Sequence, residues 1–314
     1  MSTGRDKIAA NGGRMKHLTF AAALLIAAGA FAQGDPHAGH TMPPQPTATA
    51  APAAPAAPNW AKIALEKSPR HREWVNVKNG DRTVSAYVVY PEVKAKATSV
   101  VVIHEIFGMS DWVQLLADEL AEAGYIAIAP DLLSGMGPGG GGTSSITEPN
   151  GVGKAIRDLP PDQITADLNA VADYVAKLPA ANGKVAVAGF CWGGAQSFRF
   201  ATNRPSLAAA FVFYGNGPDS PEAIEKIKAP VYGFYAGNDA RIGATVPKTM
   251  EMMTAAKKTF EIVTYEGSGH GFMRAGDGPP PAADADQKVR DAYAGNKKAR
   301  DEAWTRWKAI LKKL

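Results

Sequence analysis

The sequence predicts an α/β fold, with a mostly parallel central sheet and helices on both of its faces. Two observations lead to this prediction. Short apolar runs that suit strands buried on both faces alternate with helical segments along most of the chain. The connections between them are short except at one place, as in sheets built from parallel strands and crossover helices.

Seven segments are expected to form strands. Residues 83–90 alternate and are rich in β-branched and aromatic side chains, which is typical of an edge strand. The other segments are nearly continuous apolar runs, which favour positions inside the sheet. They are residues 99–104, 125–129, 185–188, 207–214, 231–235 and 260–265.

The segments between these strands have helical character. Asp111 is expected to cap a helix that ends at Gly124. Pro160 and Pro161 are expected to open another, which runs to residue 178. Further helices are predicted at residues 193–201, 222–227, 246–256 and 282–314. The Gly-rich stretch at residues 131–159 is too long for a plain connection, so it is predicted to be a functional loop or lid.

The N-terminus has the features of a secretory signal peptide. A basic start precedes an apolar run at residues 18–28, and Ala30-Phe31-Ala32 forms a small-x-small cleavage pattern. We therefore expect residues 1–32 to be removed, with Met15 as an alternative start. The apolar run is short for a membrane span. The prediction is export to the periplasm or the medium without a stable membrane anchor, and an uncleaved anchor is the alternative.

Residues 33–59 are rich in Ala, Pro and Thr and carry almost no charge, so they are predicted to be a disordered linker before a catalytic domain at residues 60–314. The chain has 46% hydrophobic and 20% charged residues, as globular proteins do. Its net charge is +4, but most of this excess lies ahead of the apolar run. No basic run with interleaved aromatic residues is present, so we expect no nucleic-acid partner.

The chain contains a single cysteine, Cys191, in the sequence GFCWGG at residues 189–194. A strand is predicted before it and a helix after it. This is the pattern of a nucleophile elbow, G-x-nucleophile-x-G, with cysteine in place of the usual serine. A lone cysteine is more often a small buried apolar residue, but the start of a helix favours a thiolate. Cys191 is therefore the candidate nucleophile.

An acid and a base follow in the order that this kind of site requires. Asp239 comes after the strand at 231–235, and His270 comes after the strand at 260–265. The carboxyl ends of parallel strands meet at one edge of a sheet, where ligands bind. His270 would exchange a proton with the thiol and the leaving oxygen, and Asp239 would orient the imidazole ring.

The turn after the strand at 99–104 is expected to provide part of an oxyanion hole. The backbone N–H groups of Ile106 and Trp192 are the candidate donors. Glu105 is unusual beside them, because its charge would oppose the developing oxyanion. It either turns away, as a solvated or ion-paired carboxylate, or acts as a local base for the thiol.

Four motifs resemble those of the dienelactone hydrolase family. They are HEIFG at residues 104–108, GFCWGG at 189–194, GND at 237–239 and GHGFMR at 269–274, and the resemblance extends over residues 70–314. It implies the α/β-hydrolase fold and a carboxymethylenebutenolidase-like activity. It also implies a Cys191–His270–Asp239 triad and makes Glu105 the carboxylate that holds the resting thiol.

The resemblance also implies that Arg274 binds a carboxylate of the substrate. Phe107 and Trp192 are expected to contact the substrate beside it. The family has a second anion-binding arginine, for which Arg157 is the nearest candidate. The export signal and the Gly-rich residues 135–142 depart from the family's pattern, so the resemblance leaves the substrate itself open.

The sequence therefore predicts an exported hydrolase that cleaves a small ester or lactone without a cofactor or metal ion, and the resemblance implies that this substrate carries a carboxylate. Two alternatives are a non-catalytic protein that binds small molecules on this fold and a thiol-dependent redox protein. The absence of a second cysteine to resolve a disulfide disfavours the redox protein.

Overall fold

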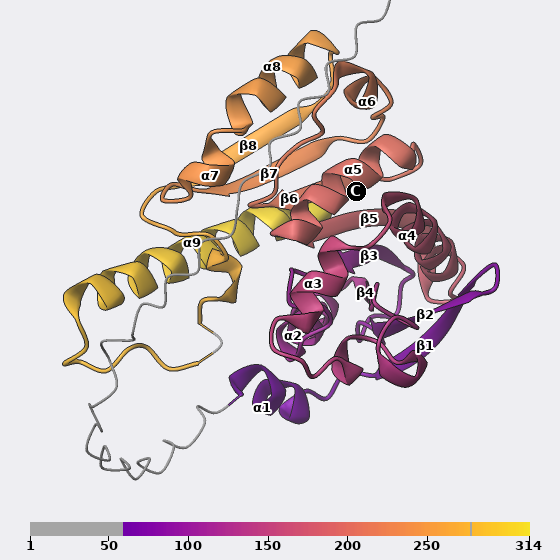
Figure 1. The fold of residues 1–314 in the computed structure, drawn as a ribbon, viewed down its shortest axis with the longest axis horizontal. Helices are drawn as coiled ribbons and strands as arrows, with labels where there is room; N and C mark the ends of the chain where they lie inside the picture. The colour runs from indigo at the N-terminus through magenta and orange to yellow at the C-terminus, as the bar shows by residue number, and fades with distance from the viewer. Residues whose placement is uncertain (1–58, 277) are drawn as a thin grey trace, which may run out of the picture. The chain divides into compact units, whose positions relative to one another are not determined.

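An eight-stranded sheet organises the part of the chain that the computed structural model describes, residues 59–276 and 278–314 (Figure 1). The strand order is β1-β2-β4-β3-β5-β6-β7-β8. The strands from β4 to β8 run parallel, whereas β2 is antiparallel to both β1 and β4. The bounds are β1 Arg72–Asn79, β2 Arg82–Val89, β3 Ala97–Ile103, β4 Ile126–Pro130, β5 Ala181–Phe190, β6 Ala209–Phe213, β7 Val231–Ala236 and β8 Phe260–Tyr265.

Helices cover both faces of the sheet, as the sequence predicts. Residues of α4, α5, α6 and α8 pack into the core on one face, and residues of α1, α2 and α9 pack into the core on the other. The bounds are α1 Trp60–Lys67, α2 Asp111–Glu122, α3 Gly151–Arg157, α4 Pro161–Ala176, α5 Trp192–Asn203, α6 Pro221–Glu225, α7 Ala240–Gly243, α8 Val246–Ala255 and α9 Gln287–Leu311. The predicted α/β fold class is confirmed.

Strand β3 shows why the inner strands read as continuous apolar runs. Val101 and Ile103 belong to the core on the α4–α5 face, whereas Val100 and Val102 belong to the core on the α2–α9 face. All four side chains are fully buried. Burying a side chain of this size stabilises the fold by about 1.5–3 kcal/mol, so an apolar residue is favoured at each of these four positions.

Several elements differ from the sequence-based expectations. The segment at 83–90 is not the edge of the sheet, because β1 pairs with it along its whole length. The three apolar residues of β1 lie among charged and polar ones, half of its eight residues are exposed and only Val77 is buried, which hides the strand in a search for apolar runs. The N-cap of α2 is Ser110 rather than Asp111, which is the first helical residue. The long connection at 131–159 contains helix α3.

The predicted signal peptide at residues 1–32 lies outside the described residues, as does nearly all of the predicted linker. The described residues belong to one compact unit, Ala57–Leu314. No helix within that described part combines the length and the apolar character that a membrane crossing requires.

Candidate active site

Cys191 lies at the junction of β5 and α5. It is the N-cap of α5 and has φ +56° and ψ −117°, a conformation that residues other than glycine rarely adopt. Its N–H donates to the carbonyl of Phe213 at 3.0 Å, which ties the turn to the end of the neighbouring strand β6. Such strain persists only where the surroundings hold it, and it is concentrated at functional sites.

Two glycines of the elbow are required by close packing. A Cβ on Gly189 would lie 1.8 Å from the carbonyl oxygen of Gly193, and a Cβ on Gly193 would lie 2.4 Å from the carbonyl oxygen of His104. No side chain fits at either distance. The start of α5 therefore packs directly against the end of β3, and this brings Cys191 and Trp192 beside the turn that carries Glu105 and Ile106.

The structure brings His270 and Asp239 to Cys191 from two other strand ends. His270 Nε2 lies 3.0 Å from Cys191 Sγ, and its Nδ1 lies 2.5 Å from Asp239 Oδ2. A carboxylate has no proton to give, so Nδ1–H donates to Asp239. The other oxygen, Oδ1, accepts from the N–H of Ile242 at 3.2 Å in the first turn of α7, which fixes the carboxylate.

Burial and charge differ along this row of three residues. The side chain of Asp239 is 6% exposed, whereas that of His270 is 31% exposed, so the carboxylate is shielded and the imidazole reaches solvent. The pKa of His270 is raised to about 9, chiefly by its hydrogen bond to Cys191 and further by Asp239, while burial acts in the opposite direction. Both partners thus favour an imidazolium beside the sulfur.

The two candidate oxyanion donors are unoccupied by the protein. Neither the N–H of Ile106 nor that of Trp192 has a hydrogen-bond partner among the described residues. The turn is closed by the N–H of Gly108, which donates to the carbonyl of Glu105 at 3.1 Å. Within the described residues, no protein acceptor therefore competes for either N–H group.

Comparison with known proteins identifies the family of this chain. The sequence profile of the dienelactone hydrolase family matches residues 84–314. The chain belongs to this family.

Among its relatives is a protein named as a carboxymethylenebutenolidase from Salmonella typhi, which is 33% identical over 68% of this chain and 84% of its own length. A protein of the same name from Saccharolobus solfataricus is 30% identical over 74% of this chain and 94% of its own. A dienelactone hydrolase structure from Klebsiella pneumoniae subsp. pneumoniae superposes with a TM-score of 0.65 at 26% identity, covering 78% of this chain and 99% of that one. The chain is thus a hydrolase of an ester- or lactone-cleaving family.

Glu105 of this dienelactone hydrolase homologue pairs with an arginine rather than with the thiol. Its side chain is 3% exposed, and its Oε2 accepts from Arg274 Nη1 at 2.7 Å. Its Oε1 accepts from the hydroxyl of Tyr214 at 3.3 Å. No hydrogen bond joins Glu105 to Cys191 in the described part of the chain. In this structure, the Glu105 carboxylate is therefore ion-paired with Arg274 and is not bonded to the thiol.

Tyr214 is a site residue that the sequence does not reveal. It follows β6 with φ +41°, is fully buried, and its ring lies 5.0 Å from that of His270. Burial, followed by the nearby charge of Glu105, raises its pKa well above the usual value, so the phenol stays protonated and donates to Glu105. Only its position at a strand end beside the elbow, shared with Asp239 and His270, could have indicated it.

The guanidinium of Arg274 lies close to two aromatic rings. Its guanidinium carbon is 5.2 Å from the centre of the Phe107 ring and 5.3 Å from that of Trp112. Phe107 is 59% exposed, and Arg274 is 41% exposed, so both reach the protein surface beside the site. Arg157 ends α3, which covers Ile106, and it makes no hydrogen bond or ion pair with the other candidate residues among those described.

Cysteine, histidine and carboxylate side chains are the groups that could hold a metal ion, and His104 is one of them. The described residues contain no cluster of three or more His, Cys, Asp or Glu side chains arranged to hold a metal ion. His104 is fully buried, and its Nδ1 lies 2.9 Å from the carbonyl oxygen of Glu105. Its ring stacks on Trp192 at 5.5 Å, so it supports the turn from below rather than facing a ligand.

The protonation of His270 is directly testable. We expect its pKa, measured by NMR titration of the ring, to be near 9 in the wild type. Because both neighbours favour the protonated ring, removing either one lowers this pKa. Cys191→Ala should lower it more than Asp239→Asn, since the contact with Cys191 is the larger cause. The other histidines serve as internal controls, and an unperturbed His270 in the wild type would contradict the geometry.

Proposed function

We propose that the chain cleaves a small carboxylic ester or lactone by attack of the Cys191 thiolate on the carbonyl carbon. The distance of 3.0 Å between His270 Nε2 and Cys191 Sγ, with Asp239 behind the ring, carries this proposal. His270 accepts the thiol proton, and the imidazolium is held beside the sulfur by the charge of Asp239. The raised pKa of His270 supports a protonated imidazole beside the sulfur at neutral pH.

The remaining steps follow from the groups around the sulfur. Attack forms an S–C bond and moves the carbonyl π electrons to oxygen, where the N–H groups of Ile106 and Trp192 stabilise the negative charge. Collapse breaks the bond to the leaving oxygen, which receives the proton from His270. Water, deprotonated by His270, then attacks the thioester, and Cys191 leaves as the thiolate.

The proposal is tested by alkylation. Since the chain contains one cysteine, iodoacetamide should add one carbamidomethyl group per chain, and hydrolysis should disappear in proportion to the adduct measured by mass spectrometry. A slowly released ester should protect the thiol and give an acyl adduct on Cys191. A binding protein or a redox protein on this fold would show no such acyl adduct. Hydrolysis that survives complete alkylation would refute the cysteine mechanism.

The position of Arg274 supports a substrate with a free carboxylate. Only Nη1 is used by Glu105, and the other guanidinium nitrogens have no partner within the described residues. Contacts with the Phe107 and Trp112 rings restrict the guanidinium, which lowers the entropy lost when a ligand binds. We propose that a carboxylate of the substrate binds to these nitrogens.

We propose that Glu105 acts through Arg274 as a positioning residue. In Glu105→Gln, the ion pair becomes a weaker hydrogen bond between the arginine and an uncharged amide oxygen, so kcat/KM for a carboxylate-bearing ester should fall about tenfold. The rate of alkylation of Cys191 by a neutral reagent should stay within about twofold of wild type, because His270 is retained. If ester hydrolysis and alkylation of Cys191 both slowed to the same extent, Glu105 would instead act as a base for the thiol.

A further inference from the structure

An open cavity of about 790 Å³ lies away from the triad, between the β1–β2 hairpin and the Gly-rich segment that follows β4. Its lining includes Trp74, Asn76, Arg82 and Ser85 on the hairpin, with Gly140, Gly141, Gly142 and Ser144 on the other side. None of Cys191, Asp239 and His270 lines it. The volume is within the range of about 300–1,000 Å³ that is usual for small-molecule sites.

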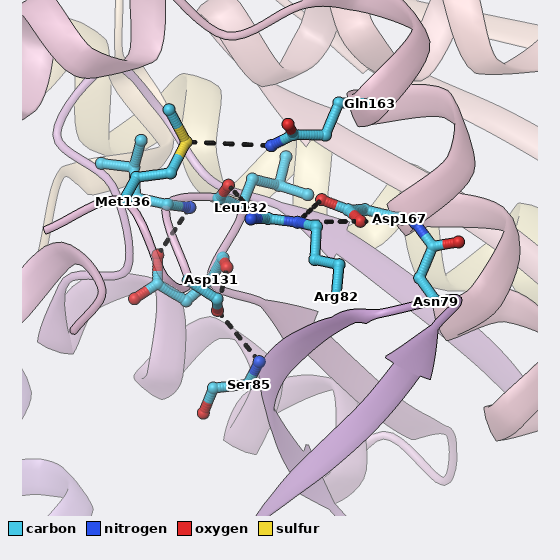
Figure 2. Close-up of polar contacts among 10 residues, drawn as sticks. Asn79, Arg82, Ser85, Asp131, Leu132, Met136, Gln163 and Asp167 are labelled. Carbon is cyan, nitrogen blue, oxygen red and sulfur yellow. Dashed lines mark hydrogen bonds and ion pairs between the residues drawn. The ribbon is translucent and has the colours of Figure 1, made fainter. Parts of the chain in front are cut away.

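The hairpin side of this cavity is rigidly held. Figure 2 shows the Arg82 side chain directed at Asp167 of α4, which is fully buried and accepts from Arg82 Nε at 2.9 Å and from Asn79 at 2.8 Å. Arg82 Nη2 also donates to the carbonyl of Leu132 at 3.0 Å. A buried carboxylate with this many donors fixes the start of β2 relative to α4 and to the segment after β4.

The Gly-rich side is held by a second buried carboxylate. Asp131 accepts from the N–H of Thr143 at 2.8 Å and from its hydroxyl at 2.7 Å. A Cβ on Gly142 would lie 2.2 Å from Asp131 Oδ2, so the close approach of the two segments requires glycine there. Ser134 Oγ accepts from the N–H of Ser85 at 2.9 Å and joins this side to the hairpin. The cavity is therefore preformed.

Several polar side chains of the lining are left without hydrogen-bond partners by the described residues. The side chains of Asn76, Asp81, Ser85 and Ser144 make no hydrogen bond with any described residue. Trp74 is 50% exposed, and its ring packs at 5.3 Å on that of Tyr87, which fixes the orientation of the indole. A half-exposed indole that packs on a neighbouring ring provides an apolar surface beside unpaired donors and acceptors.

The charges of the lining determine which ligand fits. The guanidinium of Arg82 is neutralised by Asp167, so it offers little attraction for an anion. Asp81 and Asp131 add negative charge, which disfavours a carboxylate or phosphate. A purely apolar ligand would bury the unpaired amide and hydroxyl groups at a cost of about 1–3 kcal/mol each. A neutral ligand with many hydroxyl groups and an apolar ring face meets all of these conditions.

We propose that this cavity binds a saccharide, with one sugar ring on Trp74 and its hydroxyls on Asn76, Asp81 and Ser85. The site is separate from ester cleavage, but it lies close to the catalytic turn. Thr143, at the end of the Gly-rich side, accepts from the N–H of Met109 at 3.1 Å, four residues beyond Glu105. In this proposal the Gly-rich segment forms one wall of the saccharide site and is joined by Thr143 to the turn that follows Glu105.

The experiment uses the full chain carrying Cys191→Ala, so that hydrolysis does not interfere. Maltotriose, cellotriose and xylotriose are each titrated by calorimetry and by tryptophan fluorescence. We expect at least one to bind with a Kd of about 1 mM or tighter. Trp74→Ala and Asn76→Ala should each weaken that binding about tenfold or more. Trp60→Ala is the matched control, because Trp60 is also exposed but lies outside the cavity.

Trp74→Ala in the otherwise wild-type chain should hydrolyse a small soluble ester at the wild-type rate, since Trp74 touches no residue of the catalytic turn. The proposal is overturned if none of the three sugars binds below about 10 mM, or if binding survives Trp74→Ala unchanged. A loss of saccharide binding together with full ester hydrolysis would establish a second site.

Discussion

Replacing Cys191 by alanine should reduce kcat/KM for ester hydrolysis by about 10⁴-fold or more, while the fold is retained. Removing the nucleophile of a catalytic triad typically costs this much or more, because the remaining groups act only as a unit with it. The residual rate comes from the oxyanion donors and from substrate binding. The measurement is the steady-state rate on an activated ester, at enzyme concentrations high enough to detect the residual hydrolysis.

The fold of this variant should survive because the substitution changes little besides the sulfur. Alanine has the same Cβ as cysteine, so the strained conformation at φ +56° costs the two residues about equally. The hydrogen bond from the N–H of residue 191 to Phe213 is also kept. Circular dichroism and the melting temperature should therefore match the wild type, and this match attributes the loss to chemistry.

A second variant, Cys191→Ser, tests whether a hydroxyl can replace the thiol as nucleophile. Its hydroxyl occupies nearly the same position, but an alcohol is far harder to deprotonate than a thiol, and His270 is tuned to a pair with sulfur. We expect the serine variant to hydrolyse esters much more slowly than wild type, yet faster than the alanine variant. Full activity in Cys191→Ala would be fatal to the assignment, because no other cysteine exists in the chain.

The parts of this fold that are predictable from sequence are those in which one residue type has one physical reason to be present. Val100 to Ile103 are apolar because both faces of β3 are buried, and that alone identifies an inner parallel strand. Gly189 and Gly193 are glycines because no Cβ fits. A sharp strand-to-helix turn follows from that pattern, and with it the position of Cys191.

The parts that escape prediction depend on partners far apart along the chain. Glu105 and Arg274 are 169 residues apart, so nothing near either one indicates that they pair. Tyr214 reads as the last residue of an apolar strand, and only the turn at φ +41° directs its hydroxyl to Glu105. Helix α3 is short and has one buried residue, Ile156, so no apolar stripe marks it.

Because Arg274 pairs with Glu105, the effect of Arg274→Ala on substrate preference must be measured as a ratio of two rates. We expect Arg274→Ala to lower the preference for a carboxylate-bearing ester over its neutral analogue by about ten- to a hundredfold in kcat/KM. A shielded charge-assisted bond is worth about 1.5–3 kcal/mol, and about 1.4 kcal/mol corresponds to a factor of ten. The same substitution leaves the buried carboxylate of Glu105 without its cation, which is destabilising in itself.

The ratio of the two kcat/KM values separates these effects. Any disturbance of Glu105 or of the fold acts on both esters and cancels in the ratio, whereas the lost contact with the substrate carboxylate acts on one. Arg274→Lys keeps a cation for Glu105 but lacks the planar fork, so it should lose part of the preference with a smaller loss of stability. Arg306→Ala, which removes an arginine paired with Glu261 on the surface, is the control and should leave the ratio unchanged. A wild type that prefers the neutral ester, or an Arg274→Ala variant with an unchanged ratio, would mean that Arg274 serves only to neutralise Glu105, and the substrate would then need no carboxylate.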